Sequence, residues 1–186
     1  MQVSFYRKYS ISKAGLLVYF IIMVQSSFGQ IHPVSKESSI VFTIHNFGFK
    51  VTGSLDAPQG DIRFNPDSLS NSFFKVTIKS TSINTDNDSR DEHLREEDYF
   101  DVKNYPLISF VSAGIQTSGK KNEFVALGRL TIKNKTKDIQ LPFTAVKIGD
   151  GYLFTGSFKL NRRDYGVGGG STISNELTVD IKVLAR

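Results

Sequence analysis

The stretch FVALGRLTIKNKTKDIQLPFTA, residues 124–145, shows the pattern that decides the fold. Apolar or small residues occupy every second position on either side of a short polar segment, residues 133–137. The positions between them are mostly polar, as Thr131, Gln140 and Thr144 illustrate. Because successive side chains of a strand point to opposite faces, this alternation is typical of strands with one apolar face and one wet face. The stretch therefore predicts two antiparallel strands joined by a short turn.

The same period of two recurs along most of the chain from residue 38 onward. The alternating apolar sets lie at residues 40–44, 47–55, 62–64, 74–78, 108–110, 124–132, 139–145, 154–160 and 177–183. Roughly eight or nine strands are indicated, separated by Gly, Asn, Asp and Pro. A sheet of this size in one domain folds into a sandwich or closes into a barrel, and the short connections favour an up-and-down arrangement.

One segment, SRDEHLREED at residues 89–98, departs from the alternation. Ser89 is followed three residues later by Glu92, which is the spacing of a capping box and predicts a helix of two or three turns. Asp91 and Glu92 are expected in its first turn, where the helix dipole favours negative charge. The predicted fold class is therefore all-β with one short helix.

The first thirty residues have the layout of an export signal. Arg7, Lys8 and Lys13 precede the apolar run 14–24, and small residues follow up to Gly29. The run is about half as long as the roughly twenty residues that a membrane-spanning helix needs.

We therefore expect a signal peptide at residues 1–29 and a single mature domain at residues 30–186. Export predicts a periplasmic or secreted protein. The chain contains no Cys, so this domain is expected to be held together by its core without disulfides.

The net charge of +5 arises from 23 basic and 18 acidic residues, and three of the basic residues lie in the expected signal peptide. The remaining balance excludes a strongly cationic nucleic-acid binder, whose affinity depends on many clustered Lys and Arg. The charges are nevertheless segregated. Residues 86–101 hold eight acids and two Arg, whereas residues 119–163 hold ten basic residues and three acids.

The alternate strand positions that are expected to face inward are rich in aromatic residues, because most of the Phe residues after residue 30 occupy them. Two interpretations stay open, a filled core and a cavity for an apolar ligand, because an eight-stranded barrel is just wide enough for either. Gly53, Gly128 and Gly156 favour the cavity because they place no side chain in the interior. Under that interpretation the expected lining residues are Phe42, Ile44, Phe49, Val51, Phe110, Phe124, Leu130, Ile132, Leu141, Phe143, Phe154, Phe158, Val179 and Ile181.

A second set of residues combines Arg90, Asp91 and His93 with Arg162, Arg163, Asp164 and Tyr165. Three interpretations remain: an ion-pair network that fixes the helix to the sheet, recognition of a polar head group by Arg, or acid–base catalysis by His and a carboxylate.

Other kinds of chemistry find little support in the sequence. The histidines are His32, His45 and His93, with neither Cys nor HxxxH spacing, so no metal site is predicted. No Ser lies in a nucleophile elbow. We expect no cofactor.

Several ordered motifs resemble the YceI-like family of polyisoprenoid-binding periplasmic proteins. They are SSIVFTIHNFGFKVTGSL at residues 38–55, SINTDN at 82–87, RDEHLREEDYFDVKNYPLISF at 90–110, GRLTIKNKTKDIQLPF at 128–143 and NRRDYGVGGGS at 161–171. Together they extend over essentially the whole expected mature domain.

The resemblance implies a lipocalin-like antiparallel β-barrel of about eight strands with one small helix. It also implies non-catalytic binding, sequestration or transport of a long isoprenoid lipid, either a polyprenyl chain or an isoprenoid quinone. The partner is then the lipid, with transient contact with a membrane surface expected and no nucleic acid. Asn134 and Lys135 replace a usual Gly-Val, and Asn still tolerates a left-handed turn there.

Two rival functions stay open at this point. One is an enzyme that acts on a hydrophobic substrate through His93 and either Asp91 or Asp164. The other is a barrel with a solid core that acts through its surface. The oligomeric state is not readable from the sequence.

Overall fold

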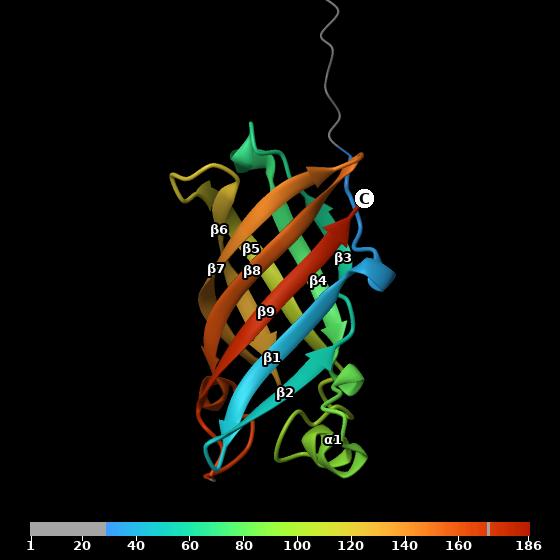
Figure 1. The fold of residues 1–186 in the computed structure, drawn as a ribbon, viewed down its shortest axis with the longest axis vertical. Coiled ribbons are helices and arrows are strands. Elements are labelled where there is room, and N and C mark those ends of the chain that lie inside the picture. The colour runs from blue at the N-terminus through green and yellow to red at the C-terminus, as the bar shows by residue number, and fades with distance from the viewer. Residues whose placement is uncertain (1–28, 171) are drawn as a thin grey trace, which may run out of the picture.

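The structure is a computed structural model that describes residues 29–170 and 172–186. The expected signal peptide lies outside the described residues except for Gly29. Nine strands form one antiparallel sheet in the order β2-β1-β9-β8-β7-β6-β5-β4-β3 (Figure 1). They are β1 (Ser39–Asn46), β2 (Phe49–Leu55), β3 (Gln59–Arg63), β4 (Phe73–Lys79), β5 (Leu107–Thr117), β6 (Glu123–Ile132), β7 (Lys135–Ile148), β8 (Gly151–Asn161) and β9 (Glu176–Ala185).

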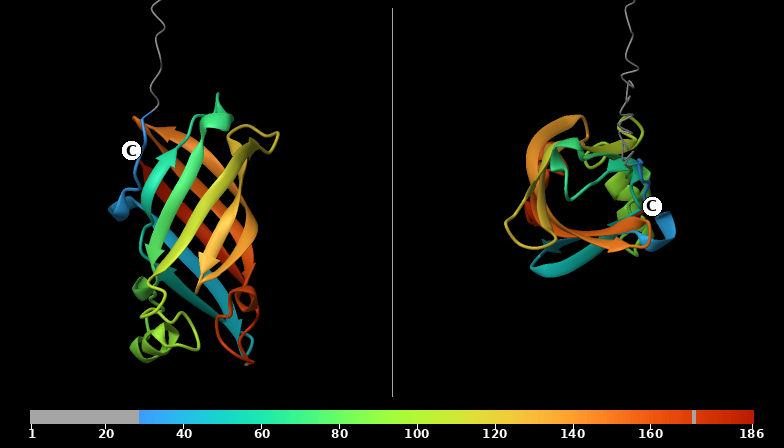
Figure 2. Two further views of the ribbon diagram at one scale, coloured as in Figure 1. Left: turned by 180° about the vertical axis from the view of Figure 1, so that it is seen from behind. Right: turned by 90° about the horizontal axis from the view of Figure 1, so that it is seen from above.

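The sheet curls strongly into a half-barrel, as the view from above in Figure 2 shows. Its edge strands are β2 and β3, and no ladder of hydrogen bonds joins them within the described ranges. Two short bridges cover this seam instead. Ile31 pairs with Ile62 of β3, and Ser54 of β2 pairs with Asn84. The predicted all-β fold is confirmed, with a curled sheet of nine strands in place of a fully laddered barrel of about eight.

The hairpin predicted from residues 124–145 is confirmed. Strands β6 and β7 pair from Glu123 with Thr144 to Ile132 with Lys135. The two residues between them, Lys133 and Asn134, have φ values of 48° and 60°. Both values are those of a type I′ turn, whose twist matches that of the flanking strands. The substitution of Asn134 for the usual Gly is therefore accommodated.

The single α-helix, α1, spans Asp88–Arg95, which is close to two turns as predicted. The predicted capping box was wrong, because the N-cap is Asn87. Its Oδ1 accepts a hydrogen bond of 2.9 Å from the backbone N–H of Arg90. Asn caps a helix as well as Ser does, and the N-cap lies two residues before the expected Ser89. In the part of the chain that the structure describes, no helix is both long and apolar enough to cross a bilayer.

The two ends of the curled sheet are different. One end carries α1, the β1–β2 turn and the loop between β8 and β9, as both Figure 1 and Figure 2 show. The opposite end carries the β5–β6 and β7–β8 turns and the segment around Gly29. The longest strands, β5 to β9, run between these two ends.

Candidate functional site: an elongated apolar cavity

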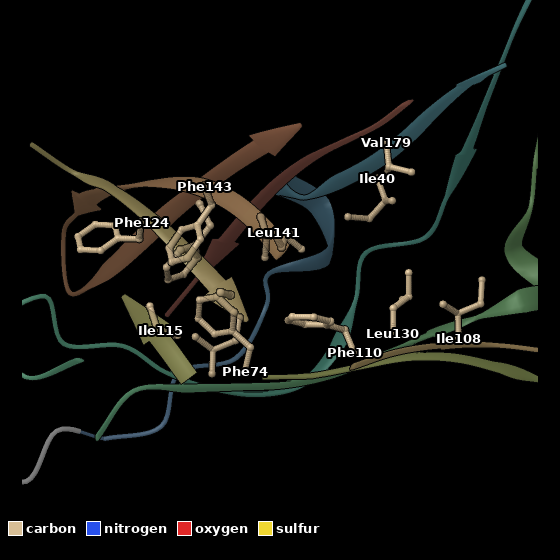
Figure 3. Close-up of a cluster of buried hydrophobic side chains, with 14 of the residues drawn as sticks. Ile40, Phe74, Ile108, Phe110, Ile115, Phe124, Leu130, Leu141, Phe143 and Val179 are labelled. Carbon is tan, nitrogen blue, oxygen red and sulfur yellow. The ribbon is translucent and has the colours of Figure 1, made fainter. Parts of the chain in front are cut away.

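The interior of the sheet contains a cavity of about 260 Å³. Side chains from opposite walls face one another across it, with Ile40 and Val179 on one wall and Ile108 and Leu130 on the other (Figure 3). Nearly all the lining side chains are aliphatic or aromatic. The inward phase of the alternating strands therefore surrounds a space that the core side chains leave unfilled.

An aromatic cluster closes the cavity at the end near the β7–β8 turn. The ring of Phe64, on the segment after β3, lies with its centroid 5.1–5.9 Å from four other rings at steep angles. These rings belong to Phe124, Phe143, Tyr152 and Phe154. Edge-to-face contacts of this kind are favourable beyond the area they bury. We call this group, together with Phe74, the aromatic cluster.

Most of the fourteen residues predicted to line a tunnel lie on the cavity wall. They are Phe42, Ile44, Val51, Phe110, Leu130, Ile132, Leu141, Phe143, Phe154, Phe158, Val179 and Ile181. The structure thus places these side chains around one space, and their role as ligand contacts stays a prediction.

Phe49 and Phe124 lie elsewhere. The prediction that Phe49 lines the interior was wrong, because its side chain is 76% exposed. Phe49 shares the inward phase with Val51 but lies at the tip of a hairpin, where no opposite wall covers it. Phe124 is buried, yet it packs beyond the end of the cavity against Phe64 and Phe143.

The inward glycines were expected to favour a cavity because they place no side chain in the interior. The structure shows that neighbouring atoms occupy the space beside them. A Cβ on Gly53 would lie 2.3 Å from the ring of Phe42, and one on Gly128 would lie 2.7 Å from the ring of Phe110. These glycines make room for neighbouring aromatic rings. Gly156 lies instead against the Pro142 carbonyl and the Ile181 side chain, so none of the three glycines adds empty space.

The few polar groups on the cavity wall gather at the end near α1. They belong to Asn46, Thr85, Arg90, Tyr99 and Arg162. Asn46, Arg90 and Tyr99 are partly exposed, so this polar end of the interior meets solvent. We call it the open end. The two charged side chains of the wall, Arg90 and Arg162, are both cationic and both lie there.

Arg90 and Asp91 are fixed through a shared partner, Thr85. The Arg90 side chain donates two hydrogen bonds of 2.7 Å, from Nε to Thr85 Oγ1 and from Nη2 to the Thr85 carbonyl. Asp91 is buried and accepts bonds from the Thr85 backbone N–H at 2.9 Å and from its hydroxyl at 2.5 Å. The first turn of α1 is thereby tied to the segment that precedes it, and the Arg90 guanidinium is held at the cavity wall.

His93, Arg163 and Asp164, which were predicted together with Arg90 and Asp91, do not join the hydrogen-bonded group of Thr85, Arg90 and Asp91. His93 is exposed, and its Nδ1 lies 3.2 Å from Glu96 Oε2. Arg163 and Asp164 are exposed, and Arg163 Nη1 donates to the Gly168 carbonyl. Within the described residues, no ion pair links α1 to Arg163 or Asp164. The ion-pair network was therefore a wrong prediction.

Within the described part of the chain, His93 pairs with neither Asp91 nor Asp164, and no cluster that could hold a metal ion is found. Asp91 bonds to Thr85 and His93 pairs with Glu96, so the two are not arranged as base and orienting carboxylate. No group of three His, Asp or Glu side chains gathers in residues 29–170 and 172–186.

Of the two arginines in the motif at residues 161–171, the one that faces the cavity is Arg162, which is 6% exposed. Its guanidinium donates hydrogen bonds of 2.7–3.3 Å to backbone carbonyls of Val167, Gly169, Ile173 and Ser174. Burial lowers the pKa of Arg162, and the neighbouring Arg163 charge lowers it further. Arg162 and Arg163 are adjacent and identical in type, so only their alternation along the chain could have indicated which one faces inward.

The loops of the open end are joined to each other by backbone contacts. The Gly168 N–H donates to the Asp98 carbonyl at 2.8 Å, and Lys133 Nζ donates to the carbonyls of Glu97 and Gly166. Gly168 has a φ of +68°, and a Cβ there would lie 2.9 Å from the Tyr99 ring. Hydrogen bonds therefore connect the loops of the open end into one rim. Glycine is required at position 168 because φ is positive there and because a Cβ would come too close to the Tyr99 ring.

These features define a class of protein: a strongly curled antiparallel sheet that encloses an elongated apolar cavity with a cationic rim at one end. Comparison with known proteins then identifies the family. Residues 31–185 match the YceI-like domain, and the chain belongs to the YceI-like family.

Relatives in sequence and structure agree with this assignment. The chain is 31% identical over 153 residues to a UPF0312 protein of Pseudomonas savastanoi pv. phaseolicola, covering 78% of this chain and 79% of that protein. Its fold is similar to that of BcnA from Burkholderia cenocepacia, with a TM-score of 0.77, 24% identity and coverage of 81% and 98%. A polyisoprenoid binding domain from Saccharophagus degradans, implicated in plant cell wall breakdown, has a TM-score of 0.68 at 13% identity, covering 84% of this chain and 97% of the domain.

Proposed function

We propose that this protein binds a long isoprenoid lipid, a polyprenyl chain or an isoprenoid quinone, in its cavity without acting on it chemically. Binding of this kind serves to sequester or carry a lipid through water. The observation that carries the proposal is an elongated apolar cavity whose charged lining residues lie only at the open end.

The size and polarity of the cavity support an apolar occupant. An engineered apolar cavity of about 150 Å³ stays dry and binds benzene. The cavity here measures about 260 Å³ and its wall is almost entirely hydrocarbon. A hydrocarbon tail that fills this space gains about 0.8 kcal/mol for each CH₂ that it buries.

The distribution of polar groups supports one orientation for an amphiphile. Towards the aromatic cluster the wall offers only apolar side chains, whereas Arg90, Thr85 and Arg162 line the open end. Guanidinium groups bind phosphate, carboxylate or carbonyl oxygens well. We therefore place the tail towards the aromatic cluster and the head group beside Arg90. His93 and Arg163 do not line the cavity, whereas Arg90 and Arg162 do. We therefore propose Arg90 and Arg162 as the residues that bind the head group.

Family membership is consistent with this ligand class. A structural neighbour, the S. degradans domain, is a polyisoprenoid binding domain. At 13% identity that likeness supports the fold alone, so the choice of an isoprenoid over another long apolar molecule is our proposal.

We also propose that the domain works outside the cytoplasm after removal of residues 1–29. The basic residues followed by an apolar run support this. Expression of the full chain in a bacterial host, followed by fractionation and N-terminal sequencing, tests it. A protein that stays in the cytoplasm with its first residue intact would overturn it.

The binding proposal is tested by filling the cavity from within. Val179 lies in the middle of β9, is 9% exposed and faces the cavity. Val179→Phe places a ring in that space, whereas Lys182→Phe adds the same ring at an exposed position of the same strand. The purified proteins are incubated with an isoprenoid quinone in detergent, passed through gel filtration and extracted for mass spectrometry.

We expect near-stoichiometric quinone in the wild type and in Lys182→Phe, and little in Val179→Phe. Quinone should also raise the Tm of the first two proteins and leave that of Val179→Phe unchanged. Folded wild-type protein that takes up no quinone, or Val179→Phe that takes up as much as the wild type, contradicts the proposal. Lipid extracted from protein purified out of its native host then identifies the chain length and head group.

A further inference from the structure

The tip of the β1–β2 hairpin exposes two large apolar side chains. Phe47 is 72% exposed and Phe49 is 76% exposed, the highest values among the large apolar side chains that the structure describes. They flank Gly48 and together form the segment that we call the Phe tip, residues 47–49. Exposed apolar surface of this kind marks a site of interaction with a protein or a membrane.

The turn itself does not require phenylalanine. Phe47 has a φ of +50° and Gly48 a φ of +80°, so both central residues of the turn are left-handed, as in a type I′ turn. That conformation favours Asn, Asp or Gly at the first position and is uncommon for a bulky residue. The chain therefore accepts an unfavourable backbone conformation and an exposed ring at Phe47. An observed conformational cost that the fold does not need indicates a functional role for the residue.

The Phe tip lies directly beside the open end of the cavity. The backbone N–H of Phe47 donates to the Thr172 carbonyl at 3.2 Å, and Thr172 Oγ1 donates to Asn46 Oδ1 at 2.8 Å. Asn46 also pairs with Ile173, and both of these residues line the cavity. The tip and the rim of the cavity are therefore one hydrogen-bonded unit, visible together at the lower end of Figure 1.

The charges around the tip are compatible with a bilayer surface. Residues 39–55 contain Lys50 and His45 and no Asp or Glu, and residues 165–175 contain no acidic residue either. Most acids of the open end lie on α1 and the segment after it, and Asp164 and Glu176 flank the β8–β9 loop. Phosphate groups of lipids would meet Lys50 and backbone at the Phe tip itself.

We propose that the Phe tip docks on a lipid bilayer by inserting Phe47 and Phe49 into its interface, which places the open end of the cavity at the membrane surface. The inference rests on the proposed function, because a bilayer is where an isoprenoid tail is held before it enters the cavity. Docking through the tip would let the tail move from bilayer to cavity with little exposure to water.

Two substitutions remove the rings without harming the hairpin. Phe47→Asn creates the Asn-Gly sequence that suits a type I′ turn, so it is expected to leave the fold intact or more stable. Phe49→Thr keeps a residue with high strand propensity. The matched control is Ile148→Thr, which removes an exposed apolar side chain at the opposite end of the sheet.

The experiment measures co-sedimentation with vesicles of phosphatidylethanolamine and phosphatidylglycerol, and uptake of an isoprenoid quinone from those vesicles. We expect each tip variant to lower the fraction bound to vesicles about tenfold, and Ile148→Thr to leave it unchanged. Uptake from vesicles should slow in parallel. Binding of quinone presented in detergent should stay the same in all four proteins.

Three results overturn the inference. The wild type could fail to sediment with vesicles, or the tip variants could bind them as well as the wild type does. The wild type could also prove to be a dimer in light scattering that becomes monomeric in Phe47→Asn, which would assign the tip to self-association. Loss of detergent-presented binding in the wild type would contradict the proposed function instead, so the two failures are distinguishable.

Discussion

The two ends of the cavity are closed by different means. At one end Phe64 and Phe74 pack against rings from β6, β7 and β8, and packing alone closes the space. At the other end the rim consists of α1 and loops, held by hydrogen bonds from Arg90 and Arg162 to backbone carbonyls. The rings are in mutual contact, whereas the loops of the rim are held by side-chain hydrogen bonds, so we expect a ligand to enter through the rim.

The cavity therefore has one end that is closed by packed rings and one end that can serve for access. Under the proposed function, a ligand would enter and leave at the open end and stop at the aromatic cluster, with its tail inside and its polar group at the rim. We therefore expect the aromatic cluster to contribute mainly to stability and the rim to contribute mainly to access. Substitutions at the aromatic cluster should chiefly change the free energy of unfolding, and substitutions at the rim should chiefly change the local order of the loops.

The largest expected effect is that of Phe64→Ala. Phe64 is 5% exposed and packs against five other rings, so removing its ring leaves a void in the aromatic cluster. The free energy of unfolding should fall by about 3–5 kcal/mol. Urea unfolding followed by circular dichroism measures this loss. The control is Phe49→Ala at the exposed tip, which should change the free energy by about 0.5 kcal/mol or less. Equal losses in the two variants would mean that the aromatic cluster does not close the cavity.

Removal of the buried guanidinium at the rim should have the next largest effect. Arg162→Met keeps the length of the side chain but leaves the carbonyls of Val167 and Ser174 without their donor. We expect a loss of about 3 kcal/mol, with faster amide hydrogen exchange in residues 166–175. Arg163→Met, at an exposed position, should cost about 1 kcal/mol or less. If Arg163→Met loosened the loop as much as Arg162→Met, the position of Arg162 at the cavity wall would not matter.

A pH-dependent effect at the rim follows from Tyr165, which is 2% exposed. Burial, and then the charge of Asp164, raises its pKa from 10.0 to about 12. Between these values the unfolded chain has lost this proton and the folded chain keeps it, so stability falls as the pH rises.

At about pH 11 the loss should reach roughly 1.4 kcal/mol, because each unit of pKa difference corresponds to about that energy. The measurement is urea unfolding of the wild type and of Tyr165→Phe at about pH 9 and about pH 11. The wild type should lose more stability than the variant between these pH values. Identical losses would show that Tyr165 ionises as easily in the folded chain as in the unfolded one.

The sequence predicted the sheet well because alternation reports directly on strand faces. It predicted the inward phase of Phe42, Leu130 and Val179, which all face the cavity. The alternation could not show where the sheet stops, so Phe49, on the same phase, was assigned to the interior although it lies beyond the opposite wall. Phase is a local property, whereas coverage by another wall depends on tertiary structure.

The polar rim was predicted less well for a related reason. Charged residues in the two motifs suggested ion pairs between them, but the Arg side chains found backbone carbonyls and Thr85 instead. Carbonyl groups occur at every residue and leave no signal in the sequence. Which of Arg162 and Arg163 is buried depends on where β8 ends, and strand ends are the least well marked features of an alternating pattern.

The smallest expected effect separates two possible starts of α1. The sequence predicted Ser89 as the N-cap, whereas the structure shows Asn87 Oδ1 accepting the Arg90 N–H. Asn87→Ala should therefore cost about 1 kcal/mol, and it should increase hydrogen exchange in residues 88–95. Ser89→Ala lies within the helix and should be neutral or slightly stabilising, because Ala has the higher helix propensity. Since Arg90 reaches the cavity wall from this first turn, Asn87→Ala should also weaken binding of a lipid with a polar head more than that of a plain hydrocarbon. Equal weakening for both ligands would show that the helix contributes to the rim by its bulk alone.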